Sequence, residues 1–352
     1  MISEYLIIGA GVAGLTTAQR LLLQGASVTI VERGAVGRES SWAGGGILSP
    51  LCPWDYPDEV TRLTSLGAAL YPQWATDLHA ATGIDPEYEV SGMLVLPPFD
   101  HSLARQWCEE HGVRLEEKDE SLLLPDVAQV RNPRLVQALR KHVEMLGGHI
   151  VEQCEVQGIS TDGGRVQALF TSGGEISADR YIVTAGAWSK QLLGAYALQL
   201  DIKPMRGQML LFKFAHPPLR HILLQGGMYL IPRRDGHLLV GSTMEDVGFD
   251  TSTTVEARDS LWQRAQLLLP ALRDMPLVQH WSGLRPASPR NIPTIGQHPQ
   301  LDNLYLNSGH FRYGVTMAPA SVAILMNELN GVEQPFDASP YHAAWGIAAK
   351  KY

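Results

Sequence analysis

Cysteine is scarce in this chain of 352 residues. The three cysteines, Cys52, Cys108 and Cys154, are widely spaced, form no C-x-x-C pair and are odd in number. A disulfide framework or a cysteine-based zinc site is therefore not expected, and no metal is predicted. We interpret these residues as reduced, buried thiols in a cytosolic protein.

Positive charge is also in short supply. Lys and Arg number 28 against 36 Asp and Glu, for a net charge of -8, and no basic run is present. This balance argues against a nucleic-acid partner and favours a small molecule. The first apolar stretch is interrupted by Gly9, Gly11, Gly14 and Arg20, so neither a signal peptide nor a membrane span is predicted. We expect a soluble, cytoplasmic protein.

The first 32 residues hold the most informative motif. Residues 4–8 predict a buried parallel strand, residues 15–23 a helix and residues 27–31 a second strand that ends at Glu32. Residues 9–14 form a G-x-G-x-x-G between the first strand and the helix. This order of elements is typical of a dinucleotide-binding βαβ unit, whereas the glycines alone would also fit an ordinary turn.

Each residue of the motif has a physical role in dinucleotide binding. Gly9 permits a tight turn, Gly11 lets the backbone approach a pyrophosphate, and Gly14 lets helix and strand pack closely. The helix N-terminus supplies free N–H groups and a positive dipole end for the phosphates. Glu32, 18 residues after Gly14, can accept hydrogen bonds from a ribose diol and disfavours NADP. The motif does not separate NAD from FAD.

Two later segments also indicate close backbone approach to a flat ligand. Residues 37–50 place Ser40 and Ser41 shortly before three consecutive glycines, at positions 44–46. Residues 180–184 predict an apolar strand that ends at Ala185-Gly186. Glycine permits backbone angles and close contacts that other residues do not.

The middle of the chain predicts a second, mostly β domain. Asn132-Pro133 is interpreted as an N-cap followed by a first-turn proline, and the helix it begins should stop at Gly147-Gly148. Turn signals at residues 162–164 and 172–174 predict a small antiparallel meander. Further strands are predicted at residues 89–96, 149–156, 206–214, 228–232, 237–243 and 304–306.

The segment GHFRYG, residues 309–314, precedes a helix predicted from about Thr316 to Leu329. Arg312 in this segment is either a solvated loop charge or a guanidinium directed into a cleft. Its glycines would let the backbone pass close to a ring system. The following helix would point its positive end at whatever precedes it.

Taken in order, six motifs resemble the D-amino-acid oxidase family of flavoproteins, and within it the bacterial glycine oxidases of thiamine biosynthesis. They are the fingerprint at residues 9–14, the serine-glycine segment, and residues 181–188, 203–208, 281–286 and 309–314. The resemblance covers essentially the whole chain.

The resemblance implies a fold and a division into domains. The fold is α/β, with a Rossmann-type FAD-binding domain like that of glutathione reductase and an inserted, mostly antiparallel β substrate domain (α+β). We predict that residues 1–80, 140–200 and 296–352 form the FAD domain. Residues 81–139 and 201–295 are predicted to form the substrate domain. A homo-oligomer is also expected.

The resemblance further implies FAD-dependent oxidative deamination of glycine or small D-amino or N-methyl amino acids. Hydride would pass from Cα to flavin N5, and O2 would be reduced to H2O2. Arg285 and Arg312 would hold the substrate carboxylate, and Tyr229 would help to hold the substrate. The expected cofactor contacts are Gly9, Gly11, Val12, Ala13, Gly14, Glu32, Arg33, Ser40, Ser41, Gly45, Gly46, Ile47, Val156, Ala185, Gly186, Trp188, His310, Phe311, Arg312, Tyr313, Gly314, Val315 and Thr316.

Residue chemistry is consistent with these roles and leaves alternatives. The planar fork of an arginine pairs with both oxygens of a carboxylate, but Arg285 could instead form a surface salt bridge, and a tyrosine in an apolar strand is often core. We interpret His310 as a loop histidine that bonds backbone, and expect no protein base. Because no cysteine follows Cys154, the late cysteine that attaches flavin in the related sarcosine oxidases is missing, and FAD should be non-covalent.

Two other functions stay open at this stage. One is an FAD-dependent D-amino-acid dehydrogenase that passes electrons to a quinone or a protein. The other is a non-catalytic nucleotide-binding module. Arg285 and Tyr229 in the inserted domain argue mildly against it. The preferred substrate and any delivery of the imine to a thiazole synthase do not follow from the sequence.

Overall fold

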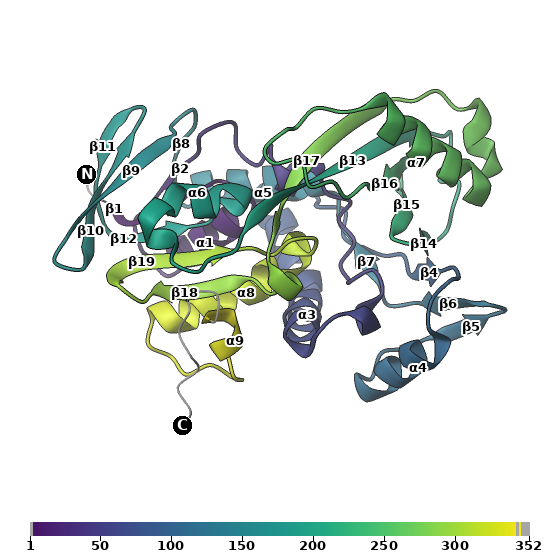
Figure 1. Cartoon of the computed structure of the whole chain (residues 1–352), viewed down its shortest axis with the longest axis horizontal. Coiled ribbons are helices and arrows are strands. Elements are labelled where there is room, and N and C mark those ends of the chain that lie inside the picture. The colour runs from purple at the N-terminus through teal and green to yellow at the C-terminus, as the bar shows by residue number, and fades with distance from the viewer. Residues whose placement is uncertain (1–2, 343–344, 346–352) are drawn as a thin grey trace.

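The computed structural model describes residues 3–342 and 345. Two large sheets lie on opposite sides of the molecule in Figure 1. The first contains, in spatial order, β18 (Thr294–His298), β19 (Leu301–Ser308), β12 (Ala178–Val183), β1 (Ser3–Ile8), β2 (Val28–Val31) and β8 (His149–Val151). All neighbours in it are parallel except β18 and β19. This is the doubly covered parallel sheet that the fingerprint predicts.

Both faces of the first sheet are buried, and β1 shows how. Tyr5 and Ile7 pack with residues of α1 (Val12–Leu23), α3 (Asp58–Thr82), α5 (Asn132–Met145) and α8 (Gly314–Leu329). Leu6 and Ile8 point to the other face, because side chains alternate along a strand. That face is covered by α6 (Ser189–Leu193) and by a three-stranded meander of β9 (Val156–Asp162), β10 (Arg165–Thr171) and β11 (Gly174–Ile176).

The second large sheet is almost entirely antiparallel. Its order is β17 (Gln279–Ala287), β13 (Lys203–Lys213), β16 (His237–Gly241), β15 (Met228–Pro232), β14 (Ile222–Gln225), β4 (Met93–Val95), β6 (Ser121–Leu124) and β5 (Glu116–Lys118). Only the β14–β4 pair among these is parallel. One face packs against α7 (Val255–Leu268) and the other includes contacts with α4 (His101–Glu110).

Short elements complete the described chain. They are α2 (Ser40–Ala43), α9 (Ser339–His342), the two-stranded pair β3 (Glu89–Val90) and β7 (Ala128–Gln129), and the 3-10 turns η1 (Pro53–Asp55), η2 (Gly186–Trp188), η3 (Gly194–Ala197), η4 (Pro270–Asp274) and η5 (Pro289–Asn291).

The structure corrects several predicted boundaries. The strand predicted at residues 89–96 is two strands, because Gly92 adopts a positive φ of 67° between them. The strand predicted at residues 149–156 ends at Val151. Asn132 is not an N-cap: the cap position is Arg131, and the Asn132 amide donates to the Ser41 carbonyl at 3.0 Å. Its side chain therefore joins α5 to α2 instead of closing its own helix.

The predicted domain division stays a prediction. The strands of the first sheet fall within residues 1–80, 140–200 and 296–352, except that β18 begins at Thr294. The strands of the second sheet fall within residues 81–139 and 201–295. The predicted boundary at residue 140 falls inside α5, which packs with α1. Residues 1–2, 343–344 and 346–352 of the predicted FAD domain lie outside the described residues.

Candidate functional site

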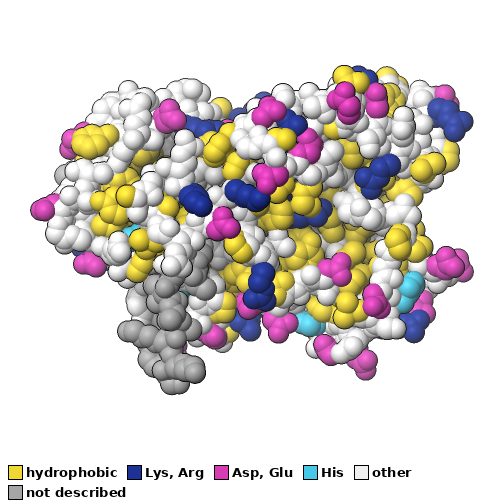
Figure 2. All heavy atoms as spheres, in the orientation of Figure 1, with side chains coloured by type: hydrophobic (Ala, Val, Ile, Leu, Met, Phe, Trp, Pro, Cys, Tyr) yellow, Lys and Arg dark blue, Asp and Glu magenta, His cyan; other side chains and the backbone are white. Residues whose placement is uncertain are grey.

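A cavity of about 730 Å³ lies between the two large sheets. It is lined from the first sheet by the ends of β1, β2 and β19 and by the residues that follow β12, and from the second by β13, β15 and β17. Figure 2 shows a hollow at the centre of the visible face, where hydrophobic side chains gather and Lys or Arg side chains lie at the rim. The volume is within the range of small-molecule and cofactor sites.

All but one of the predicted site residues line this cavity. They are Gly9, Gly11, Val12, Ala13, Glu32, Arg33, Ser40, Ser41, Gly45, Gly46, Ile47, Val156, Ala185, Gly186, Trp188, Tyr229, Arg285 and residues 310–316. The exception is Gly14, where an added Cβ would lie 2.0 Å from the Gly9 carbonyl oxygen. Gly14 therefore permits close packing of α1 on the β1 turn and is not part of the cavity wall.

The fingerprint end of the cavity is organised around Glu32. This carboxylate is 7% exposed, and it accepts hydrogen bonds from the Ala10 and Gly34 amides at 2.8 and 2.9 Å. Each oxygen keeps a lone pair for a further donor. At the start of α1, the Val12 amide donates to Ser41 Oγ at 2.9 Å, and no acidic side chain occupies the first turn. The positive helix end is therefore available to an anion.

An aromatic stack at the cavity joins the two sheets. The Arg33 guanidinium lies 3.6 Å from the centre of the Trp188 ring, and Trp188 stacks on Phe249 at 5.4 Å. Arg33 also pairs with Glu39 at 2.7 Å. Phe249 lies in the connection between β16 and α7, both of which belong to the second sheet and its covering helix. It therefore completes a cavity wall whose other residues, Arg33 and Trp188, follow strands of the first sheet.

The glycine-rich segment at residues 44–47 presents backbone to the cavity. Gly46 has a positive φ of 75°, and Thr316 at the start of α8 donates to the Ile47 carbonyl at 3.0 Å. Within the described part of the chain, the amides of Gly45, Gly46 and Ile47 donate to no acceptor. Amides without partners in the wall of a cavity indicate a ligand that completes their hydrogen bonding.

His310 lies in the cavity wall in an unexpected state. Burial lowers its pKa to about 4, so the ring is neutral at neutral pH. We predicted that its imidazole would bond backbone. Instead Nε2 is buried with no hydrogen-bond partner among the residues described.

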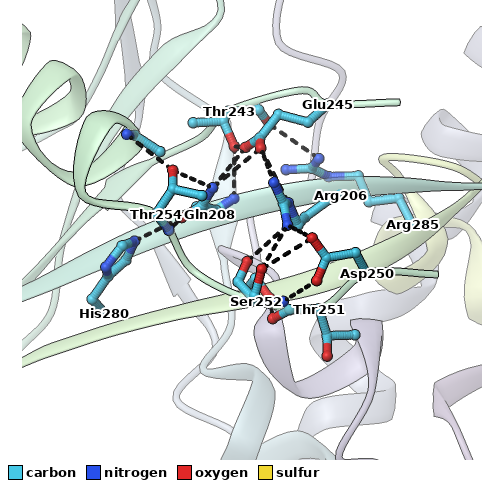
Figure 3. Close-up of polar contacts among 12 residues, drawn as sticks. Arg206, Gln208, Thr243, Glu245, Asp250, Thr251, Ser252, Thr254, His280 and Arg285 are labelled. Carbon is cyan, nitrogen blue, oxygen red and sulfur yellow. Dashed lines mark hydrogen bonds and ion pairs between the residues drawn. The ribbon is translucent and has the colours of Figure 1, made fainter. Parts of the chain in front are cut away.

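Arg285 lies at the opposite end of the cavity, on β17. Its Nη2 donates to Ser242 Oγ at 2.7 Å and its Nη1 to the Thr243 carbonyl at 3.2 Å (Figure 3). Burial lowers the pKa of Arg285, Tyr229 acts against that shift, and the nearby Arg312 adds to it. The guanidinium is therefore a partly buried cation with donors left for a ligand. It forms no ion pair with the described residues, so the surface salt bridge considered for it is not found among them.

Arg312 and Tyr229 face the same end of the cavity. Within residues 3–342 and 345, Arg312 forms no ion pair and donates no hydrogen bond that would occupy its guanidinium. Tyr229 is buried and its hydroxyl lies 3.8 Å from Met209 Sδ. It belongs to a hydrophobic core cluster and also lines the cavity, so its predicted contact with the substrate stays a prediction.

Behind Arg285, a polar network holds the residues that it contacts. Arg206, 4% exposed, pairs with Glu245 and Asp250, each at 2.6 Å. The Thr243 hydroxyl bonds to Glu245, and the Gln208 amide donates to the same hydroxyl at 2.9 Å (Figure 3). Sequence reasoning missed this network, because its members meet only through the pairing of β13 with β17 and the chain after β16.

The described residues outside this site hold neither a metal cluster nor a membrane-spanning helix. The ranges 3–342 and 345 hold no cluster of His, Cys, Asp or Glu suited to a metal ion. In those ranges no helix is long and apolar enough to cross a membrane. The cysteines are free: Cys108 and Cys154 are buried, as predicted, but Cys52 is only half-buried, and its pKa is raised to about 11 mainly by burial.

The residues of the cavity fit FAD, and the comparisons agree. The model of the DAO family, described as FAD dependent oxidoreductase, matches residues 4–328, and the chain belongs to this family. FAD is therefore its cofactor: Glu32, the α1 N-terminus and the unpaired amides of residues 45–47 are the groups that would hold it. When bound, FAD supplies two-electron oxidation of the substrate.

Among its relatives are two glycine oxidases of similar length. That of Pseudomonas aeruginosa is 44% identical over 98% of this chain and 99% of the relative, and that of Pseudomonas putida is 41% identical over 97% and 98%. The crystal structure of glycine oxidase from Geobacillus kaustophilus superposes with a TM-score of 0.90 at 26% identity, covering 96% of this chain and 97% of that one. The predicted family and fold class are confirmed.

Proposed function

We propose that this protein oxidises glycine or a small D-amino or N-methyl amino acid to its imine, with FAD as cofactor and O2 as electron acceptor. The substrate loses two electrons and two protons, and O2 gains both and becomes H2O2. Water then converts the imine to a 2-oxo acid and releases the nitrogen as an amine, which is ammonia when the substrate is glycine. The glycine oxidases of Pseudomonas, which align over nearly the full length of the chain, support this reaction.

The observation that carries the proposal is the position of Arg285. Its guanidinium is partly buried, faces a cavity that fits FAD, and is fixed by Ser242 and Thr243 with donors to spare. A planar cation of this kind recognises a carboxylate through two parallel hydrogen bonds. Arg312 adds a second cation at the same end, and Tyr229 limits the space beside it.

The residues at the cavity favour oxidation without a protein base. His310 has a pKa of about 4 and would be neutral under ordinary conditions. Glu32 lies at the fingerprint end, where backbone amides hold it. A substrate amine that enters in its neutral form can give up hydride directly, so holding the carboxylate and orienting Cα–H is the main task of the protein.

A substrate screen tests the proposal. The purified holoprotein is incubated with glycine, sarcosine, D-alanine and D-proline, and H2O2 is measured by a peroxidase-coupled assay. We expect peroxide with at least one of them and none with L-alanine. Reduction of an artificial dye without peroxide would instead favour a dehydrogenase, and no turnover with any of the four would contradict the proposal.

Together with this reaction we propose a biosynthetic role, a cellular location and an oligomeric state. Relatives named bifunctional protein ThiO/ThiG align with 92–100% of this chain over about half their own length, at 30–34% identity, and support a role in thiamine thiazole biosynthesis. We further propose a cytoplasmic location and a homo-oligomer. Gel filtration with light scattering tests the last of these.

A further inference from the structure

Arg233 is a buried cation beside the glycine-rich segment of the FAD cavity. It follows β15 directly, and it is 4% exposed. Its Nη1 donates to Gln129 Oε1 at 2.6 Å and to the Val130 carbonyl at 2.9 Å, and its Nη2 donates to the Gly45 carbonyl at 2.7 Å. These bonds connect β15, the end of β7 and the cavity wall.

Carboxylates act on this charge only from a distance: Glu87, Asp235 and Glu89 raise the pKa of Arg233 without touching it. Within residues 3–342 and 345, Arg233 forms no ion pair, and its Nε has no partner. Burial lowers its pKa to about 10, so it is still protonated at neutral pH. A buried cation with only neutral partners costs free energy. Such a group is a candidate for a functional role.

One bond from Arg233 and one from the Val130 amide fix the direction of two neighbouring peptide N–H groups. In a trans peptide the carbonyl and the following N–H point in opposite directions. Because the Gly45 carbonyl points to Arg233, the Gly46 N–H points away from it. The Gly46 carbonyl accepts from the Val130 amide at 2.9 Å, so the Ile47 N–H also points away from β7. Both residues line the cavity.

The glycines make this arrangement possible. An added Cβ at Gly45 would lie 2.6 Å from Ile231 Cδ1, and one at Gly46 would lie 2.1 Å from the Val130 carbonyl oxygen. The segment is therefore pressed against β15 and the chain after β7, with its free amides on the other side. Arg233 is the side chain that holds it there through a charge-assisted hydrogen bond.

We propose that Arg233 is a positioning residue for FAD. By holding the Gly45 carbonyl, it directs the Gly46 amide at the cofactor, beside the Ile47 amide that the Val130 N–H orients. Its unpaired charge, one peptide behind the cavity wall, favours the addition of electrons to the cofactor. The proposal rests on the FAD site alone and is independent of which substrate is oxidised.

The test compares Arg233→Met and Arg233→Lys with Arg234→Met. Arg234 is the matched control, because it is the next residue, its side chain is 49% exposed and it pairs with Glu89 at 3.2 Å on the surface. Three quantities are measured without turnover: the dissociation constant of FAD from refilled apoprotein, the midpoint potential of bound FAD by dye equilibration, and the melting temperature of the apoprotein.

For Arg233→Met we expect FAD to bind at least tenfold more weakly and its midpoint potential to become more negative than in Arg234→Met. Arg233→Lys keeps the charge but not the fork, so we expect weaker FAD binding with a potential close to that of the unaltered protein. A lower melting temperature with unchanged FAD affinity and potential would show a merely structural role and overturn the proposal. If Arg233→Met does not fold, unchanged FAD affinity in Arg233→Lys overturns it.

Discussion

The guanidinium of Arg285 lies against the backbone of Gly207 on the neighbouring strand. An added Cβ at residue 207 would lie 2.1 Å from Arg285 Nη2. In the β13–β17 ladder Gly207 faces Gly283, and Arg285 faces Met205, so the arginine crosses the ladder diagonally to reach this position. Any side chain at residue 207 would have to displace it.

Gly207→Ala should therefore weaken substrate binding and spare the cofactor. We expect KM to rise by about tenfold or more, because a shift of about 1 Å in a positioning group has effects of this size. The FAD absorbance spectrum should not change. Gly158→Ala is the control. Gly158 lies on β9, and an added Cβ there would meet the Phe170 side chain at 3.6 Å, an ordinary van der Waals distance. An unchanged KM in Gly207→Ala would contradict the assigned position of Arg285.

Arg285 and Arg312 should contribute unequally to holding the substrate carboxylate. Ser242 and Thr243 fix Arg285, whereas Arg312 has no such support, so Arg285→Lys should raise KM roughly 100-fold and Arg312→Met roughly 10-fold. Because both would hold one carboxylate, their effects should not add. Steady-state kinetics and FAD titration of both variants and the double variant check this. Equal, additive effects would be evidence against a shared ligand.

Glu245 should act on the substrate through Arg285. It holds the Thr243 hydroxyl, and the Thr243 carbonyl accepts from Arg285. We expect Glu245→Gln to raise KM about two- to tenfold with little change in kcat, because a positioning bond is weakened and no reacting group is lost. Asp246→Asn is the matched control, since Asp246 pairs with the exposed Lys203. A lower kcat with an unchanged KM would argue against an effect of Glu245 on the substrate through Arg285.

Stability should fall in mild acid because of His310. Its pKa is about 4 in the folded protein against 6.5 ordinarily, so the unfolded chain binds more protons between these values. The contribution is fully present above pH 6.5 and is lost as the pH falls towards 4. Linkage gives a decrease of about 2 kcal/mol in unfolding free energy between pH 7 and pH 5.

Urea unfolding of the holoprotein at saturating FAD measures this decrease. His310→Asn should reduce the pH dependence, and His216→Asn, at an exposed position, should leave it as it is. His142, His280 and His298 also have pKa values lowered mainly by burial, so some acid sensitivity should survive in the variant. An identical pH dependence with and without His310 would exclude it as the cause.

FAD should be released by acid precipitation. Cys154 lines the cavity, but the late cysteine that attaches flavin in the sarcosine oxidases has no counterpart after it. We expect the supernatant of trichloroacetic acid treatment to hold all of the flavin absorbance. A yellow pellet would contradict non-covalent binding, and its loss in Cys154→Ser would identify the attachment point.

Short-range sequence pattern was enough to predict the secondary-structure elements at the fingerprint end of the cavity. The strand, glycines, helix and Glu32 of the fingerprint are close in sequence, and each has one physical reason for its type. The helix predicted from about Thr316 begins two residues earlier, at Gly314, because glycine is a weak but allowed first residue. Local pattern failed at Asn132, where the side chain bonds a different element rather than its own helix.

The rest of the site depends on pairing that sequence does not display. Gly207, Met209 and Ser242 join the cavity wall or its support only because β13 lies between β16 and β17. Arg233 follows a strand and precedes a turn, a context typical of a surface charge. Its burial is a consequence of the glycine-rich segment packing over β15, a contact between residues far apart in the chain.

The segment from Ser40 to Ile47 touches both ends of the cofactor cavity. Ser41 accepts from the first amide of the fingerprint helix, while a few residues later Ile47 is tied to the start of α8. One short stretch of chain would therefore contact both the nucleotide and the ring of FAD. If binding at one end orders this stretch, we expect the two halves of FAD to strengthen each other's binding.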